Sequence, residues 1–126
     1  MTKKVIQTDA APKAVGPYSQ AIDTGSLVFC SGQIAIDPAT NEVLNVGVKE
    51  QTERVMKNIQ AVLKTAGLDF SHVMKTTIFL TDMKDFATVN EVYASYFQQP
   101  YPARSTVAVA GLPKGVNVEI EVTAAR

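Results

Sequence analysis

The sequence has few of the residues that mark redox, metal-binding or nucleic-acid-binding proteins. Cys30 is the only cysteine among 126 residues, which excludes an internal disulfide and is typical of a reducing compartment. His72 is the only histidine and no CxxC spacing occurs, so a zinc site with the usual ligands is not supported. No basic run is longer than Lys3–Lys4, and 12 basic residues balance 12 acidic ones, which argues against a nucleic-acid partner.

Long apolar segments and phosphate-binding motifs are missing as well. No apolar stretch approaches the ~20 residues that a membrane span needs, and the first ten residues lack the apolar segment of a signal peptide. The patterns GxxxxGK[ST], GxGxxG and GxSxG are absent. We therefore expect a cytoplasmic protein with no membrane partner, and its length predicts one domain over residues 1–126.

Hydrophobic periodicity predicts alternating strands and helices. Strands are expected at 4–7, 18–22, 27–31 and 72–81, helices at 48–66 and 85–97, and two further strands after residue 102. Gly67 is a good residue to end the first helix, Asp85 is a candidate N-cap of the second, and Gly32 indicates a bulge or a close approach to the backbone. The order β-β-β-α-β-α-β-β predicts an α+β fold, a two-layer sandwich of one mixed β-sheet with two helices on one face.

Several predicted strands are apolar on both faces. In residues 27–31, Leu27 and Phe29 alternate with Val28 and Cys30, so neither side of the strand is polar. Two helices cover only one face of a sheet, and a strand that is apolar on both faces needs cover on both. The pattern therefore predicts a closed homo-oligomer whose subunits meet over the other face.

Two charged residues stand in the β-patterned segments that flank the bend at residues 111–115. Arg104 opens the first segment and Glu119 lies in the middle of the second. If the segments form an antiparallel pair about 4.8 Å apart, both side chains can share one sheet face and form a pocket for a small acid. Arginine suits the bidentate capture of a carboxylate, and a partly buried glutamate has a raised pKa that suits proton transfer.

Each candidate also has a plain structural interpretation. Arg104 can be a solvated or ion-paired cation, and Glu119 can belong to the wet side of an amphipathic strand. Cys30 fits an inert buried thiol, and His72 a surface position. Tyr18 suits a core position at a strand edge as well as a hydroxyl presented to a ligand.

Five segments in order make the chain similar to a known family. They are GPYSQA at 16–21, SGQI at 31–34, DFATVN at 85–90, PARS at 102–105 and VEIE at 118–121. Together they resemble the RidA-type branch of the Rid (YjgF-like) family, the reactive-intermediate deaminases, over essentially the whole chain. The resemblance implies a chorismate-mutase-like fold, a homotrimer with sites between subunits, and hydrolysis of 2-enamines and 2-imines such as 2-aminoacrylate to 2-keto acids and ammonia.

The resemblance also implies roles for particular residues and needs no metal or cofactor. Arg104 would clamp the carboxylate of a small imino or enamino acid, and Glu119 would position the attacking water. The implied substrate-binding residues are Tyr18, Ser31, Gly32, Asn90 and Thr106, with Tyr18 reaching in from a neighbouring subunit. Some relatives carry a cysteine where this chain has Thr106, so catalysis here does not depend on that thiol, and the loop before Arg104 is compact.

Two other functions remain open. A non-catalytic, carboxylate-binding regulatory trimer would use the same pocket. RNA cleavage is attributed to some members of the family, but zero net charge, a single histidine and the lack of a basic-aromatic patch argue against it.

Overall fold

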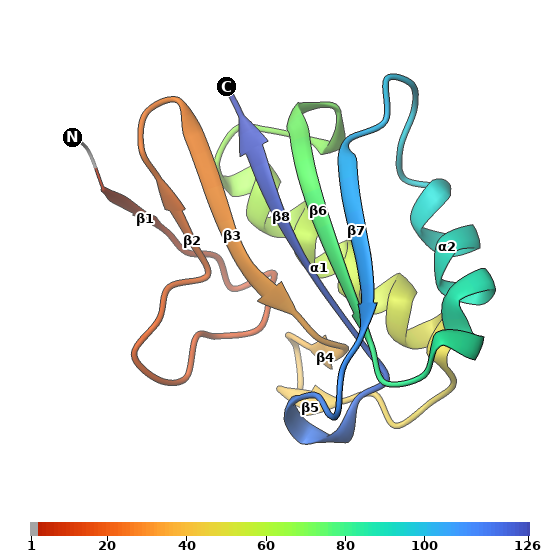
Figure 1. Cartoon of the computed structure of the whole chain (residues 1–126). Coiled ribbons are helices and arrows are strands. Elements are labelled where there is room, and N and C mark those ends of the chain that lie inside the picture. Colours follow the sequence, from red (N-terminus) through yellow and green to blue (C-terminus); the bar gives the residue numbers. More distant parts are fainter. Residues whose placement is uncertain (1–2) are drawn as a thin grey trace.

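A computed structural model describes residues 3–126 and shows a mixed six-stranded sheet with two α-helices, an α+β fold as predicted (Figure 1). The sheet strands are β1 (Lys4–Ile6), β2 (Ala21–Asp23), β3 (Leu27–Gln33), β6 (Val73–Leu80), β7 (Ala103–Ala108) and β8 (Val118–Ala125), and the helices are α1 (Val48–Thr65) and α2 (Phe86–Ala94). A small hairpin of β4 (Ile36–Asp37) and β5 (Glu42–Val43) was not predicted, nor were the 3-10 turns η1 (Phe70–His72), η2 (Met83–Asp85) and η3 (Pro113–Gly115). No helix in residues 3–126 is long and apolar enough to cross a bilayer.

The strand order β1-β2-β3-β8-β6-β7 corrects the predicted pairing of the last two strands. β7 and β8 are not an antiparallel pair, because β6 lies between them. α2 connects β6 to β7, and a helical crossover returns the chain parallel to the strand that it left. β8 alternates buried and more exposed residues and pairs with both β3 and β6, which places it in the middle of the sheet.

Helix α1 packs one apolar stripe against the sheet, as its periodicity predicted. Its fully buried residues include Val55, Ile59 and Leu63, and it contacts β8 and β3. Figure 1 shows α1 behind these strands. Truncating one such aliphatic side chain to alanine costs about 2–5 kcal/mol of stability, so the stripe is the main support of this helix. Gly67 ends it at φ +79°, in the left-handed region that glycine tolerates.

Helix α2 begins differently from the prediction. Asp85 occupies the N-cap position, but its side chain makes no capping hydrogen bond and its backbone is helical. The carboxylate of Asp82 instead accepts a hydrogen bond of 2.9 Å from the Lys84 N–H and caps the preceding turn η2. The capping carboxylate is therefore three residues earlier than expected, because a 3-10 turn leads into the helix.

The sheet face opposite the core carries exposed apolar side chains. Phe29 is 47% exposed, Val107 43% and Leu27 37%. They come from β3 and β7, the strands on either side of the central β8–β6 pair, and lie outside the core that α1 covers. The apolar character of this second face, predicted from the alternation in the sequence, is confirmed.

One partly buried ion pair links β2 to the end of α1. Arg126 Nη2 donates to Asp23 Oδ2 at 2.6 Å and to the carbonyl of Ala66 at 2.7 Å. The Arg126 hydrogen bond, helped by the N–H of Gly25, holds the pKa of Asp23 below its ordinary value of 3.8. A depressed carboxyl pKa stabilises the fold above the pKa of the unfolded state, about 3.9, and this contribution disappears as the pH falls through the folded-state value.

We expect Asp23→Asn to flatten the pH dependence of stability below about pH 4. Urea midpoints measured between pH 3 and pH 7 test this. Asp9→Asn, at an exposed aspartate, is the matched control and should follow the wild-type curve. A wild-type pH dependence in Asp23→Asn would show that this ion pair does not contribute.

Candidate active site

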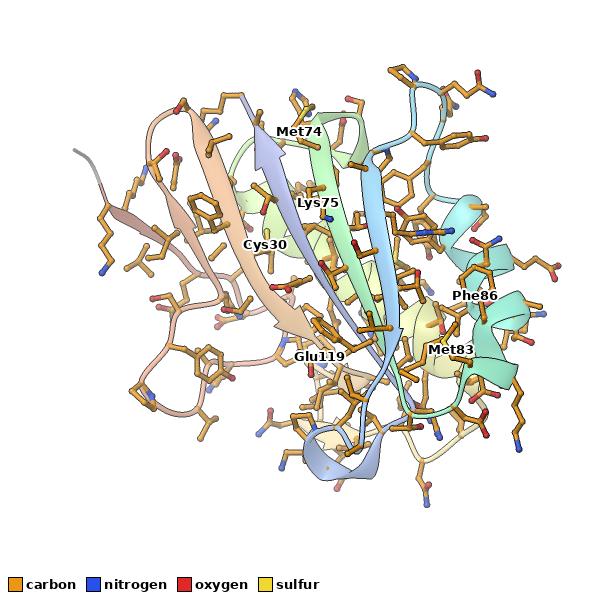
Figure 2. The ribbon with its side chains drawn as sticks, viewed as in Figure 1. Cys30, Met74, Lys75, Met83, Phe86 and Glu119 are labelled. Carbon is orange, nitrogen blue, oxygen red and sulfur yellow. The ribbon has the colours of Figure 1, made fainter. Side chains whose placement is uncertain are left out.

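A cleft with a volume of about 690 Å³ opens between the loop after β1, the end of β3 and the turn before β8. It brings together four of the seven predicted site residues: Tyr18, Ser31, Gly32 and Glu119. Figure 2 shows Glu119 beside the end of β3, facing away from α1. The cleft is also lined by residues that the sequence did not single out, among them Lys13, Ile34, Ile36 and Lys114.

The Glu119 carboxylate lies directly over the backbone of Gly32. A Cβ placed on Gly32 would be 2.9 Å from the carboxyl carbon of Glu119 and closer still to Oε2. The β3–β8 register shifts between Cys30 and Gln33, so Gly32 is part of a bulge. Both predictions for Gly32, a bulge and a close approach to bare backbone, are confirmed.

The environment of Glu119 favours its neutral form. Burial raises its pKa above the ordinary 4.5, and the neighbouring Glu121 on the same face raises it further. A carboxyl group with a raised pKa is a better proton acceptor when ionised and a better donor when protonated. This group is therefore suited to moving protons to and from a bound water.

We expect Gly32→Ala to lower any activity of this cleft about tenfold or more, because the new methyl group displaces the carboxylate. The fold should survive, since the displaced atoms are the end of a flexible side chain. Gly111→Ala is the control: nothing lies within 4 Å of the added Cβ. Unchanged steady-state rates in Gly32→Ala would contradict a role for the Glu119 position.

The loop that presents Tyr18 is anchored by Gln20, which sequence reasoning missed. Gln20 is 3% exposed; its Oε1 accepts from Thr8 N at 2.7 Å, and its Nε2 donates to the carbonyls of Thr8, Ala11 and Pro12. Ser31 Oγ donates to the carbonyl of Ser19 at 2.6 Å, so this hydroxyl also anchors the loop. Tyr18 itself is 54% exposed at the cleft. The buried glutamine was hard to find, because a lone Gln in a predicted strand carries no distinctive signal.

Arg104 lies elsewhere, and the prediction that it shares a sheet face with Glu119 is wrong within one chain. Arg104 pairs with Thr76 of β6, whereas Glu119 pairs with Phe79. Positions an odd number apart on a strand point to opposite faces, so the two charged groups lie on opposite sides of the sheet. For the same reason Arg104 is not the partner of Glu119 in the monomer.

The guanidinium of Arg104 is held by α2. Nη1 donates to Asn90 Oδ1 at 2.6 Å, and the guanidinium carbon lies 5.1 Å from the ring centroid of Tyr93 and 5.5 Å from that of Phe86. Figure 2 shows Phe86 on α2, on the other side of β7 from Glu119. Two predicted residues, Arg104 and Asn90, thus form a preorganised cation at the free edge of the sheet.

Thr106 lies two residues from Arg104 on the same face of β7. Its Oγ1 is buried and has no hydrogen-bond partner among the described residues. The backbone of this edge strand pairs with β6 only, so one side of it is open within residues 3–126. The edge, Arg104 and Asn90 form a second, separate half of the predicted site.

The other two candidate residues, Cys30 and His72, occupy positions that fit a structural role. Cys30 is buried, and burial raises the pKa of its thiol to about 12, which fits an inert core residue. His72 contacts the Asp69 carboxylate at 3.2 Å on the surface, away from both half-sites. Within residues 3–126 no group of three His, Cys, Asp or Glu side chains is arranged to hold a metal ion.

Comparison with known proteins places the chain in a family. The model of the Ribonuc_L-PSP family, described as Endoribonuclease L-PSP, matches residues 8–126. Protein DfrA of Myxococcus xanthus is 57% identical over 126 residues, covering 98% of this chain and 96% of that protein. The 2-iminobutanoate/2-iminopropanoate deaminase of Mus musculus is 48% identical over 122 residues, with 97% and 90% covered.

A solved structure agrees. The crystal structure of E. coli TdcF with bound serine superposes with a TM-score of 0.94 at 48% identity, covering 98% of this chain and 99% of that one. The mixed sheet and two helices are therefore those of an α+β protein of the Rid type. The chain belongs to the Ribonuc_L-PSP (YjgF/Rid) family, and the resemblance predicted from its sequence is confirmed.

Proposed function

We propose that this protein is a deaminase that hydrolyses 2-enamines and 2-imines, such as 2-aminoacrylate, to 2-keto acids and ammonia. The observation that carries the proposal is the half-buried Glu119 carboxylate, held over the bare backbone of Gly32 in an open cleft. Relatives named 2-iminobutanoate/2-iminopropanoate deaminase, at about half identity over almost the whole chain, support the same chemistry.

The two half-sites meet between copies of the chain. Arg104 and Glu119 point to opposite faces of one sheet, so one chain alone does not bring them together. A closed ring of copies that buries the exposed Phe29, Leu27 and Val107 brings the β7 edge of one copy to the cleft of the next. We propose three copies, each a two-layer chorismate-mutase-like unit, in a cytoplasmic protein.

The reaction needs positioning and proton transfer and no group beyond the side chains. Arg104 of one copy binds the substrate carboxylate, with Asn90 fixing the guanidinium. Glu119 of the next copy takes a proton from a water molecule while the water oxygen bonds to C2 of the imine. The C=N electron pair moves to nitrogen, which takes that proton from Glu119, so that C2 carries a hydroxyl group and an amino group. Glu119 then moves the proton of the hydroxyl to the amino group, the C–N bond breaks, and ammonia leaves as the C2 carbonyl forms. An enamine first becomes the imine when a proton moves from its nitrogen to C3.

The cleft favours this chemistry over RNA cleavage and over simple binding. Among residues 3–126 the only histidine is bonded to Asp69 outside the cleft, so the site has one carboxylate and no imidazole for an acid–base pair. A binding protein would need Arg104 and the backbone donors alone, and would not need a carboxyl group with a raised pKa. Glu119 therefore separates the enzyme from the carboxylate-binding trimer.

A coupled assay tests the proposal directly. A serine/threonine dehydratase generates 2-aminoacrylate, and its decay is followed with and without the protein, together with pyruvate formation. We expect decay faster than the spontaneous rate in proportion to the protein added. Decay at the spontaneous rate would refute the deaminase and favour the carboxylate-binding trimer.

A further inference from the structure

The cleft at Glu119 has room for more than the smallest imino acids. In a single copy its open volume is about 690 Å³, of which the β7 edge of the next copy takes up a part, and 2-iminopropanoate is a fraction of that size. The walls beyond Glu119 are formed by apolar side chains, Val15, Ile34 and Ile36 among them. A substrate held at C2 near Glu119 thus leaves space for a side chain.

Two lysines, Lys13 and Lys114, are the cationic residues of this cleft. Both line the cleft and are exposed, and neither takes part in a salt bridge among residues 3–126. Glu119 is the single acidic residue that lines the cleft. The two ammonium groups outnumber this one carboxyl group, so the lining of the cleft carries an excess of positive charge.

Lys114 is held in a backbone conformation that does not suit it. Its φ is 57° and its ψ 20°, between Pro113 and a glycine, Gly115, at φ +71°. A non-glycine residue in the left-handed region is strained, and such residues concentrate at functional sites. A lysine at this position places the cation of a tight turn, η3, at the cleft.

We propose that Lys114, assisted by Lys13, is an anion-binding subsite that recognises a second carboxylate, so that the preferred substrates are 2-imino dicarboxylic acids. This inference rests on the proposed function of the same cleft. Arg104 takes the carboxylate on C2, the apolar walls hold the methylene groups, and the lysines bind the carboxylate at the end of the side chain. Substrates with a cationic side chain are disfavoured by the same charges.

The test compares two classes of imine in one assay. Amino acid oxidases generate 2-iminopropanoate and 2-iminoglutarate in situ, and semicarbazide traps what the protein has not hydrolysed. Wild type should show the higher kcat/KM for 2-iminoglutarate. Lys114→Gly, which removes the charge and suits the left-handed backbone, should lose about tenfold on 2-iminoglutarate and stay within about twofold on 2-iminopropanoate.

Two controls make the result specific. Lys57→Ala removes an exposed lysine from α1 and should leave both rates unchanged. Raising the ionic strength should shrink the wild-type preference, because exposed charges are screened, and should not affect Lys114→Gly in this way. An equal loss on both substrates would mean that Lys114 binds the C2 carboxylate, and no preference in wild type would mean that the lysines select nothing; either overturns the subsite.

Binding separates this inference from the proposed function. Calorimetry with the stable keto acids 2-oxoglutarate and 2-oxobutanoate should show tighter binding of the dicarboxylate, reduced to parity in Lys114→Gly. If no imine is hydrolysed but this binding preference is observed, the proposed deaminase activity is refuted and the anion-binding subsite is supported. If 2-iminopropanoate is hydrolysed but the dicarboxylate gains nothing in rate or binding, the subsite alone falls.

Discussion

Arg104→Ala is expected to lower kcat/KM for 2-iminopropanoate about a hundredfold or more, with the oligomer intact. The guanidinium is already oriented by Asn90 and stacked on Tyr93 and Phe86, so its geometry is fixed before substrate arrives. Without it the substrate carboxylate has no fork-shaped partner, and the imine carbon is no longer held near the water. The coupled dehydratase assay measures the rate, and size-exclusion chromatography checks the assembly.

Arg104→Lys makes the prediction sharper. Lysine keeps the charge but cannot make two parallel hydrogen bonds or stack as a plane on Tyr93. We expect the kcat/KM of this variant to be close to that of Arg104→Ala. Its KM should be raised, so that most of the lost rate returns only at high substrate concentration. A near-wild-type rate in Arg104→Ala would refute the carboxylate clamp.

Glu119→Gln is expected to lower kcat by about 10²–10⁴-fold, the usual contribution of a positioned acid–base group. The substitution keeps the shape of the side chain over Gly32 and removes its ability to accept a proton. Keto acid binding, which needs Arg104, should be little changed. Full activity in this variant would exclude proton transfer at Glu119.

The pH dependence follows from the raised pKa. The carboxylate is the active form of a base, so the rate should rise with pH through the pKa of Glu119, which burial and Glu121 place above 4.5, and then level off. The rate should fall as the pH drops below that value. Glu119→Gln should lose this limb of the profile, whereas Gly111→Ala should keep it.

Much of the local structure could be predicted from the sequence, but the order of the strands could not. The apolar stripe of α1, Gly67 and the bulge at Gly32 each follow from local patterns, and each was found where expected. The place of β8 between β3 and β6 did not follow, because nothing in residues 118–125 specifies which strands they pair with. The tight bend before β8 is typical of a hairpin between β7 and β8. The helical crossover through α2 instead makes β7 the parallel neighbour of β6.

The same error affected the site. Glu119 and Gly32 were identified singly, but their contact depends on the β3–β8 register, which the sequence does not fix. Arg104 was expected to share a face with Glu119 because the two strands were expected to be neighbours. Gln20 and Lys114 had no recognisable pattern: one acts through burial and the other through its place in a turn.

Mixing two inactive variants tests the central claim that each site takes Arg104 from one copy and Glu119 from another. Arg104→Ala and Glu119→Gln, co-expressed with different tags and purified as mixed oligomers, should recover roughly a third of wild-type activity on 2-aminoacrylate. That share is expected because a mixed trimer has about one interface in three that pairs two intact halves. Mixed oligomers no more active than either variant alone would contradict a site shared between copies.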